Sequence, residues 1–398
     1  MRKVISREKA IKIMSEAGKP PLRSKILSLS EALGKRSASN LKAPFDLPPL
    51  SRSTRDGYAV NHRDLKGVSE GMPAYLNLIG EIRVGELPNI SISLGEAVRV
   101  FTGSYLPQGA DAVVMNEFVE ESQGVIEVYR SVAAGENVLA KGEDWPQGST
   151  ILDYGERINL GKVGLLAAYG FDKVEVIELR VGIASTGDEV VSPGNELPAG
   201  KIYDINSYTL YSLLKNWGAE PWIYGVVSDN LDKLVEVLDL LLDKSDVVVL
   251  SGGSSIGVRD YTRELFRKLK GDLLIEGLNI SPGKPTVAGW IRGKPVFGLP
   301  GHPISSIVSA RVFMIPALES MLGVANQEEP FFIRIGTNLP SVLGVEEFIC
   351  ACLGDKCILP IWGKSGAISR VARGNFLIRV PEDVEGYREG EVVEVWSI

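Results

Sequence analysis

Cysteine and histidine are scarce in this chain of 398 residues, which contains three cysteines and two histidines. Cys350, Cys352 and Cys357 are too few for a disulfide framework. Their spacing also brings no histidine or fourth thiol close enough in sequence to complete a zinc site. Because unpaired thiols suit a reducing compartment, we expect a cytoplasmic protein.

An excess of positive charge is also missing, since 43 lysines and arginines stand against 50 aspartates and glutamates, for a net charge of −7. Broad nucleic-acid binding usually requires a basic face, so we expect no nucleic-acid partner. Apolar stretches such as 163–171 contain glycine and fall short of the roughly 18 residues that a membrane span needs. The N-terminus has no apolar signal core, and we expect no membrane segment.

The length of the chain predicts several domains. The spacing of apolar residues predicts their helices and strands. A helix is expected between Ser6 and Gly18, a second one at 28–33, and short alternating strands over 44–141. From residue 181 strands alternate with helices, and the strand at 246–250 is continuously apolar after Asp246, as in a parallel sheet covered on both faces. A linker then leads to short C-terminal strands. We therefore predict a multidomain α/β plus β protein with a doubly wound α/β domain.

Polar loops follow the predicted strands of the α/β region, where an open parallel sheet binds its ligands. Their glycines let backbone amides approach an anion, and helices that start after them add partial positive charge, so a phosphate-bearing ligand is implied. One Ser-Gly-Gly loop alone is a common turn, and the prediction depends on several loops at one sheet edge. Neither a complete G-x-G-x-x-G nor a Walker A motif is present. The loops are 185–189, 228–230, 251–260 and 300–303.

Charged side chains in and near these loops suggest a metal and an anion. Glu189, Asp229 and Asp260 would repel a phosphate unless a divalent cation lay between them, and their hard oxygen atoms suit Mg²⁺. Lys284 lies between two prolines in Pro-Gly-Lys-Pro, where it suits a phosphate or oxyanion, although a turn with a solvated lysine is the alternative. His302 precedes a proline at an expected helix start, where it could cap the helix or touch the ligand, and we favour capping or packing behind the site.

Taken in order, these motifs and others in the N-terminal half resemble the molybdopterin molybdenumtransferase family, the molybdenum-insertion enzymes related to the catalytic domain of gephyrin. The resemblance extends over nearly the whole chain. It is carried by Asp-Gly-Tyr-Ala at 56–59, Thr-Gly at 102–103, Gly-Ala-Asp-Ala-Val-Val at 109–114, Gly-Glu-Asp at 142–144, Ser-Thr-Gly-Asp-Glu at 185–189, Ser-Gly-Gly at 251–253, Pro-Gly-Lys-Pro at 282–285 and Leu-Pro-Gly-His-Pro at 299–303.

The resemblance implies a domain organisation and an oligomeric state. Members of that family are elongated homodimers, and we expect the same assembly here. The implied domains are a discontinuous N-terminal domain (1–44 and 142–178), an inserted β domain (45–141), an α/β molybdopterin-binding domain (179–326) and a C-terminal β-barrel (327–398).

The resemblance also implies a reaction. Such an enzyme binds adenylylated molybdopterin, inserts molybdate or tungstate, and cleaves the adenylate to release AMP. Cleavage of a phosphoanhydride requires a metal and hydrogen-bond donors that stabilise charge on the phosphoryl oxygens. The adenylyltransferase of the same pathway is a candidate partner.

Residue roles follow from the same motif match. Glu189 and Asp260 would hold Mg²⁺, and Lys284 would neutralise an oxyanion. Asp56, Thr102 and Asp144 would act from the partner subunit, with Asp229 as a further catalytic acid. The predicted binding residues for phosphate or pterin are Thr186, Ser251, Gly252, Gly253, Ser255, Pro300, Pro303 and Ser365.

The chain departs from the family pattern at positions near these motifs. Ser281 stands where the family commonly has a basic residue, His302 where it has asparagine, and Arg55 where it has an apolar residue. The loss of a basic residue at 281 removes one positive charge from the expected oxyanion site.

Two other functions stay open from the sequence. A molybdopterin adenylyltransferase resembles only the α/β region and does not need the N-terminal motifs or the C-terminal domain. A gephyrin-like scaffold without catalysis has no need for acids that repel phosphate, such as Asp56, Asp144, Glu189 and Asp260.

Overall fold

The computed structural model describes residues 4–252, 257–324 and 329–398, and it describes no side chains for 257–261. The chain forms two compact units, Met1–Ser39 with Leu152–Ile398, and Asn40–Ile151. The division into four domains expected from the sequence stays a prediction.

The first unit begins with two short helices that the sequence predicts. In α1 (Arg7–Ala17), Ser6 Oγ accepts a hydrogen bond from the Lys9 backbone N–H. Before α2 (Leu29–Ala32), Ser28 and Glu31 form a capping box. Between these helices β1 (Arg23–Ser28) pairs antiparallel with β12 (Lys173–Glu178), so the start of the chain is tied to a segment about 150 residues later. The helix α3 (Leu160–Ala168) precedes β12.

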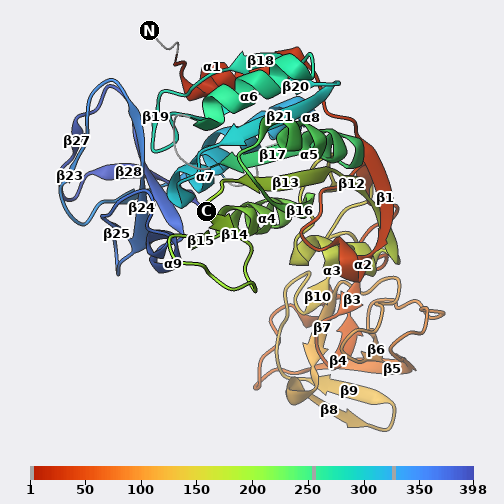
Figure 1. Cartoon of the computed structure of the whole chain (residues 1–398). Helices are drawn as coiled ribbons and strands as arrows, with labels where there is room; N and C mark the ends of the chain where they lie inside the picture. The colour runs from red at the N-terminus through yellow and green to blue at the C-terminus, as the bar shows by residue number, and fades with distance from the viewer. Residues whose placement is uncertain (1–3, 253–256, 325–328) are drawn as a thin grey trace. The chain divides into compact units, whose positions relative to one another are not determined.

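A six-stranded sheet forms the centre of this unit (Figure 1). The pairs β13–β16, β13–β17 and β17–β21 are parallel. In spatial order the strands are β16 (Glu220–Val227), β13 (Arg180–Thr186), β17 (Val247–Gly252), β21 (Lys294–Leu299), β20 (Val287–Ile291) and β18 (Asp272–Ile275).

The sheet is mixed, whereas the sequence predicted a parallel one. β20 pairs antiparallel with β21, and β18 antiparallel with β20. The reason is the two-residue connection Arg292-Gly293, in which both residues have positive φ, at 53° and 71°. Two such residues make the tight hairpin turn that reverses the chain, which leaves no room for a crossover helix.

Side chains alternate between the two faces of the sheet, and helices cover both faces. Val247 and Val249 of β17 pack with α4 (Asn206–Trp217), whereas Val248 and Leu250 pack with α5 (Leu231–Lys244). The helices α7 (Pro303–Ser309) and α8 (Ile315–Leu322) lie with α4, and α6 (Gly257–Lys268) lies with α5. A strand buried on both faces needs an apolar side chain at every position, as the sequence has at 247–250.

The segment Pro303–Leu322 is a long apolar helix. It runs through α7, a π-helical stretch at Ala310–Met314 and α8. By length and composition it could cross a membrane, but 89% of its most apolar window is buried inside the protein. Packing in the core therefore accounts for its composition.

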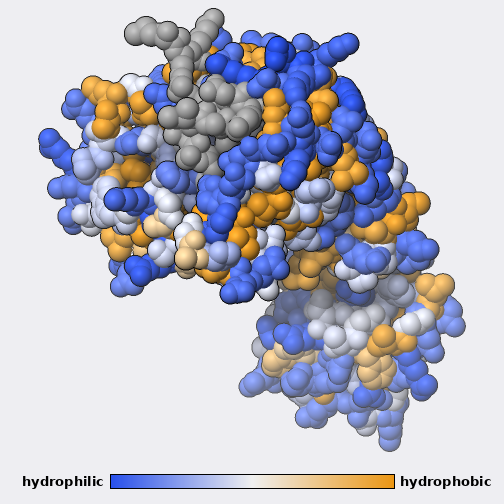
Figure 2. Space-filling view, viewed as in Figure 1, coloured by the Kyte–Doolittle hydropathy of each residue, from blue (hydrophilic) through white to orange (hydrophobic). Residues whose placement is uncertain are grey.

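On the face drawn in Figure 2, hydrophobic residues are scattered among hydrophilic ones.

The C-terminal part of the first unit is a curved sheet with its own core. Its strands pair in the order β22, β28, β26, β24 and β25, and a bridge between Ile335 and Ile358 links the two ends of that order. The strand β19 (Ile280–Ser281) joins β24, which connects this sheet to the loop that carries Lys284. The elements are β22 (Phe331–Arg334), β23 (Leu339–Pro340), β24 (Glu346–Leu353), β25 (Ile358–Pro360), α9 (Ser369–Arg373), β26 (Phe376–Val380), β27 (Gly386–Tyr387) and β28 (Val392–Ser397).

The second unit is built from short strands, as its alternating sequence predicts. A sheet with the order β7-β4-β6-β5-β9-β8 forms around buried residues such as Tyr58 and Val114. The elements are β2 (Leu41–Lys42), β3 (Arg52–Ser53), β4 (Gly57–Val60), η1 (His62–Leu65), β5 (Ala74–Ile82), β6 (Glu96–Val100), β7 (Ala112–Met115), η2 (Asn116–Phe118), β8 (Val119–Ser122), β9 (Val125–Val128), β10 (Val138–Leu139) and β11 (Thr150–Leu152, whose last residue belongs to the first unit).

Candidate functional site

A pocket of about 620 Å³ lies beyond the carboxyl ends of β17 and β21. Ligands of open α/β sheets bind at this edge. Predicted site residues in its wall are Glu189, Gly252, Lys284 and Pro300. Residues that the sequence did not assign to binding also line it, among them Ser281, His302 and Ser305.

The loop that carries Lys284 has a shape that only glycine allows at one position. Gly283 has φ of 129°, and a Cβ there would come within 2.6 Å of Ser309 Oγ and 2.7 Å of Ile280 Cδ1. Thr286 Oγ1 donates to the Gly283 carbonyl at 2.7 Å, and the Leu278 N–H donates to the Lys284 carbonyl at 3.1 Å. The backbone is therefore held on both sides of Lys284, whose exposed side chain faces the pocket.

His302 lies between the α/β region and the C-terminal sheet. It occupies the N-cap position of α7, and Pro303 is at the start of the helix, as the sequence predicts. Its side chain makes no capping hydrogen bond, so the prediction of side-chain capping is wrong. The ring Nδ1 instead lies 3.1 Å from Ser365 Oγ, and the Ile304 N–H donates to the Ser365 carbonyl at 3.1 Å. Ser365 thus reaches this end of the site from the C-terminal part.

A smaller recess of about 60 Å³ adjoins the pocket and shares Glu189, Ile202, Gly252 and Gly301 with it. The predicted residues Thr186, Ser251 and Pro303 line this recess. Its floor is a buried polar network in which Ser185 Oγ donates to Asp204 Oδ1 at 2.8 Å and Asn206 Nδ2 donates to Ser251 Oγ at 2.7 Å. Ser251 therefore accepts a hydrogen bond from Asn206, in addition to lining the recess.

Carboxylates gather where β13 and β16 end. The Asp229 N–H donates to Asp188 Oδ1 at 3.1 Å. Burial and then the negative charges of Asp188 and Glu189 raise the pKa of Asp229. Its Oδ1 is buried without a hydrogen-bond partner in the part of the chain that the structure describes. A cation or a proton would relieve both conditions.

This cluster alone does not make a complete metal site. Among the side chains that the structure describes, which do not include Asp260, no three of His, Cys, Asp or Glu are grouped so that they could hold an ion. Mg²⁺ commonly takes one or two carboxylates from the protein and the rest of its ligands from water and substrate phosphate. The donor set therefore fits Mg²⁺ if the substrate completes the coordination.

Other predicted residues of this edge cannot be located in the site. Gly253 and Ser255 lie outside the described residues. Asp260 lies in α6, but its side chain is outside the described part, so its prediction as a metal ligand is untested.

The predicted residues of the second unit form one contact. Asp56 Oδ1 accepts hydrogen bonds from the Thr102 N–H at 2.7 Å and from Thr102 Oγ1 at 2.8 Å. These two bonds lower the pKa of Asp56, the backbone one more strongly. Asp144 is exposed, and its N–H donates to the Leu47 carbonyl. The structure brings Asp56 and Thr102 together and describes no contact between them and Asp144.

Three family models together match most of the chain. Residues 5–170 match the MoeA N-terminal region (domains I and II), residues 182–320 a probable molybdopterin-binding domain, and residues 333–398 the MoeA C-terminal region (domain IV). A Methanocaldococcus jannaschii protein assigned to molybdopterin biosynthesis is 38% identical over 94% of this chain and 92% of its own. The chain belongs to the MoeA family.

Further relatives agree with this MoeA membership. The molybdopterin molybdenumtransferase of Staphylococcus epidermidis is 30% identical over 93% of this chain and 90% of its own. The crystal structure of a molybdopterin biosynthesis MoeA protein from Pyrococcus horikoshii has a TM-score of 0.81 and 32% identity, with 100% of both chains covered.

Sequence reasoning missed some polar residues of this MoeA site. Asp188, Asp204 and Asn206 were not singled out, although Asp204 and Asn206 are buried around the recess. One signal was available, because Asp204 stands two residues before the start of α4. There its Oδ1 accepts from the Ser207 N–H at 3.1 Å, as an aspartate near a helix start often does.

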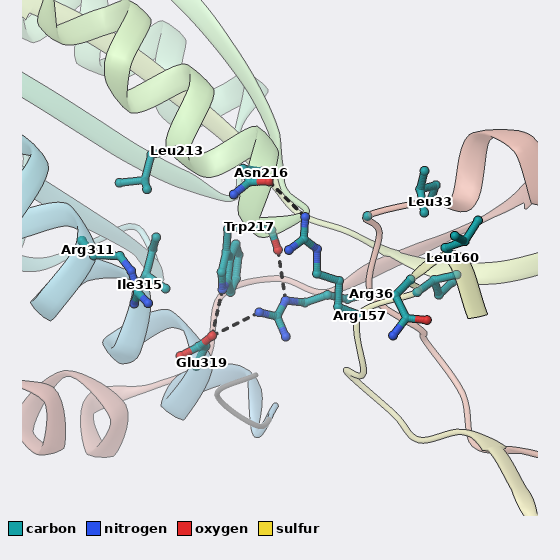
Figure 3. A pocket seen from close by; sticks show the side chains of 13 residues that line it. Leu33, Arg36, Arg157, Leu160, Leu213, Asn216, Trp217, Arg311, Ile315 and Glu319 are labelled. Atoms are coloured by element: carbon teal, nitrogen blue, oxygen red, sulfur yellow. Dashed lines mark hydrogen bonds and ion pairs between the residues drawn. The ribbon is translucent and has the colours of Figure 1, made fainter. Parts of the chain in front are cut away.

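A second pocket of this MoeA protein, of about 490 Å³, is lined by other residues (Figure 3). Arg36 and Glu319 form a buried ion pair there at 3.1 Å, and Trp217 Nε1 donates to the same Glu319 oxygen at 2.9 Å. The Arg36 guanidinium also lies over the Trp217 ring, 4.7 Å from its centroid. These contacts tie the N-terminal segment to α4 and α8, which gives the cluster a structural role.

Proposed function

We propose that this protein is a molybdopterin molybdenumtransferase that inserts molybdate or tungstate into adenylylated molybdopterin and releases AMP. The observation that carries the proposal is one pocket, at the ligand-binding edge of the sheet, lined by both Lys284 and Glu189. A lysine suits an oxyanion, and a carboxylate suits the metal that accompanies phosphate. MoeA membership over the whole chain favours this function over an adenylyltransferase, which would need only the α/β region.

In this proposal Lys284 attracts the oxyanion, which is a substrate. Its side chain emerges from a loop held by Thr286 and Leu278, so the charge is positioned before the ligand arrives. Ser281 and His302 line the same pocket and offer a hydroxyl and an imidazole to the anion. We assign the Ser365 contact of His302 to the positioning of that imidazole.

The acidic side of the site would hold Mg²⁺. Glu189 and Asp260, together with Asp229, are the residues that we expect to bind it. When bound, the ion would reduce the negative charge of the phosphate groups. The raised pKa and unpartnered Oδ1 of Asp229 support this assignment, because a nearby cation favours the charged carboxylate.

The proposal extends to the assembly. We propose a homodimer in which Asp56, Thr102 and Asp144 act in the site of the partner subunit. Thr102 holds the Asp56 carboxylate in its ionised form, which suits a residue that meets a cation or a donor group. We further propose a cytoplasmic reaction that receives its substrate from the adenylyltransferase of the same pathway.

The test is AMP release by the purified protein given adenylylated molybdopterin, Mg²⁺ and either oxyanion. The wild type should release AMP in response to the oxyanion. Lys284→Ala should raise the half-saturating oxyanion concentration by about tenfold to a hundredfold, since one charge-assisted hydrogen bond is lost. Lys233→Ala, an exposed lysine of α5, is the matched control and should change nothing. Consumption of ATP with adenylylation of free molybdopterin, and no AMP release, would favour the adenylyltransferase instead.

A further inference from the structure

Asn206 lies at the start of α4 and lines the small recess beside the pocket. Its side chain is buried, with 8% of the residue exposed. Nδ2 lies 2.8 Å from the Gly301 carbonyl oxygen and 2.7 Å from Ser251 Oγ. Because a backbone carbonyl can only accept a hydrogen bond, the amide nitrogen must face Gly301, which fixes the direction of the whole amide.

The other end of this amide has no partner in the described structure. Asn206 Oδ1 is buried and accepts no hydrogen bond from any described residue. The neighbouring polar side chains bond to one another, since Ser185 Oγ contacts both Asp204 Oδ1 at 2.8 Å and Ser207 Oγ at 2.9 Å. Buried carbonyl oxygens are nearly always paired, so a donor from a bound molecule is the missing part.

The recess has room for only the tip of a ligand. Its volume of about 60 Å³ is too small for a heterocyclic ring, but it shares walls with the pocket of about 620 Å³. One wall is formed by β14 (Val190–Val191) and β15 (Ile202–Tyr203), a two-stranded pair outside the main sheet. Such a short pair is only marginally stable by itself, so the wall can shift to admit a small donor group.

We infer that Asn206 Oδ1 accepts a hydrogen bond from the exocyclic amino group of a heterocycle bound in the adjoining pocket. The inference depends on the proposed function, whose substrate carries two such heterocycles, a pterin and an adenine. An amino group presents a donor to Oδ1, whereas an oxo group in the same place presents a second acceptor. Asn206 therefore selects amino over oxo heterocycles.

Equilibrium binding of two ligand pairs tests this selectivity in the full-length protein. AMP and inosine monophosphate differ in the amino or oxo group of the purine, and pterin and lumazine differ in the same way on the pteridine. The wild type should prefer the amino member of one pair by about tenfold to a hundredfold, which identifies the heterocycle that Asn206 contacts. Asn206→Leu should bring that ratio close to one.

The ratio within one variant separates selectivity from a general loss of binding. Asn216→Leu is the matched control, because this exposed asparagine lies at the other end of α4 and outside the recess, and it should keep the preference. If thermal unfolding shows that Asn206→Leu is not folded, the amino-to-oxo binding ratios of the wild type test the inference. Equal binding within both pairs would overturn the inference and would leave an ordered water as the donor to Asn206 Oδ1. The proposed function would not be affected by that result. Failure of both AMP and pterin to bind would contradict the proposed function as well.

Discussion

At the scale of single residues, we expect Ser281 and Lys284 to determine how strongly the pocket attracts an anion. Both line the pocket, three positions apart, with Ser281 at the end of β19 and Lys284 in the loop that follows. A basic residue at 281 would place a second charge beside Lys284. Charge-assisted hydrogen bonds contribute about 1.5–3 kcal/mol each, so Ser281→Lys should lower the half-saturating oxyanion concentration by roughly tenfold to a hundredfold.

Titration of molybdate and tungstate against AMP release measures this effect. The gain should shrink with added salt, because part of the attraction is screened. Ser281→Ala is the control for loss of the hydroxyl. An unchanged or higher half-saturating concentration for Ser281→Lys with both oxyanions would contradict the idea that the site lacks a charge at 281.

The raised pKa of Asp229 makes a prediction about stability. A carboxyl whose pKa is higher in the folded protein than in the unfolded chain favours folding only while it is protonated. Above that pKa its negative charge opposes folding, so Asp229→Asn should raise the melting temperature at pH 7 without Mg²⁺. The gain should fade as the pH drops through the raised pKa toward about 4, the ordinary value for aspartate.

Thermal unfolding at several pH values, with and without Mg²⁺, checks this prediction. Added Mg²⁺ should stabilise the wild type more than Asp229→Asn. The exposed Glu236 of α5 offers a matched control, and Glu236→Gln should show neither effect. A lower melting temperature for Asp229→Asn at pH 7 would show that the carboxylate is compensated in the free protein.

Residue types predicted the chemistry of the site better than its buried support. Glu189 and Lys284 could be selected because charged residues in glycine-rich loops after strands are unusual. Asn206 could not, since its importance comes from burial and from Ser251, a partner 45 residues away. The contact between Ser365 and His302 depends on tertiary structure, so the sequence alone could not show it.

At the scale of elements, two turns that contain glycine should respond differently to substitution: one should affect folding stability and the other oxyanion binding. Gly293 has φ of 71° in the β20–β21 hairpin, with open space around its Cβ position and at the end of β21 remote from the site. Gly293→Ala should therefore cost about 1–2 kcal/mol of folding free energy from backbone strain and leave oxyanion affinity unchanged. Denaturant unfolding and the AMP assay measure the two effects.

Gly283→Ala should behave differently, because its Cβ would meet Ser309 and Ile280 inside the loop of Lys284. The loop must move, so the half-saturating oxyanion concentration should rise at least several-fold. Equal effects of the two substitutions on binding would contradict the assignment of this loop to the site.

The periodicity of apolar residues predicted most helices and strands. It did not predict the direction of neighbouring strands, which a local turn determines. The apolar run at 247–250 predicts a buried strand but says nothing of the direction of its distant neighbours. That direction depends on Arg292-Gly293, a two-residue turn that gives an antiparallel edge. Arg292 is also held by an ion pair with Asp239 of α5, which no sequence pattern reveals.

At the scale of the whole molecule, the proposed site combines two subunits. Asp56→Ala and Asp260→Ala should each abolish AMP release. In each site Asp260 would come from one subunit and Asp56 from its partner. Mixing the two proteins should restore activity, because a mixed dimer has one site with neither substitution. Random pairing gives roughly a quarter of the wild-type activity. If subunits exchange and activity does not return, the shared site is wrong.

The central claim is that AMP release and metal insertion are one coupled reaction in the pocket that Lys284 and Glu189 line. The most direct measurement is a single turnover with adenylylated molybdopterin, Mg²⁺ and molybdate, in which released AMP and molybdenum bound to the pterin product are quantified together. The account predicts equal amounts of the two, and little AMP when the oxyanion is left out. AMP release at the same rate without an oxyanion, or with no molybdenum in the product, would contradict it.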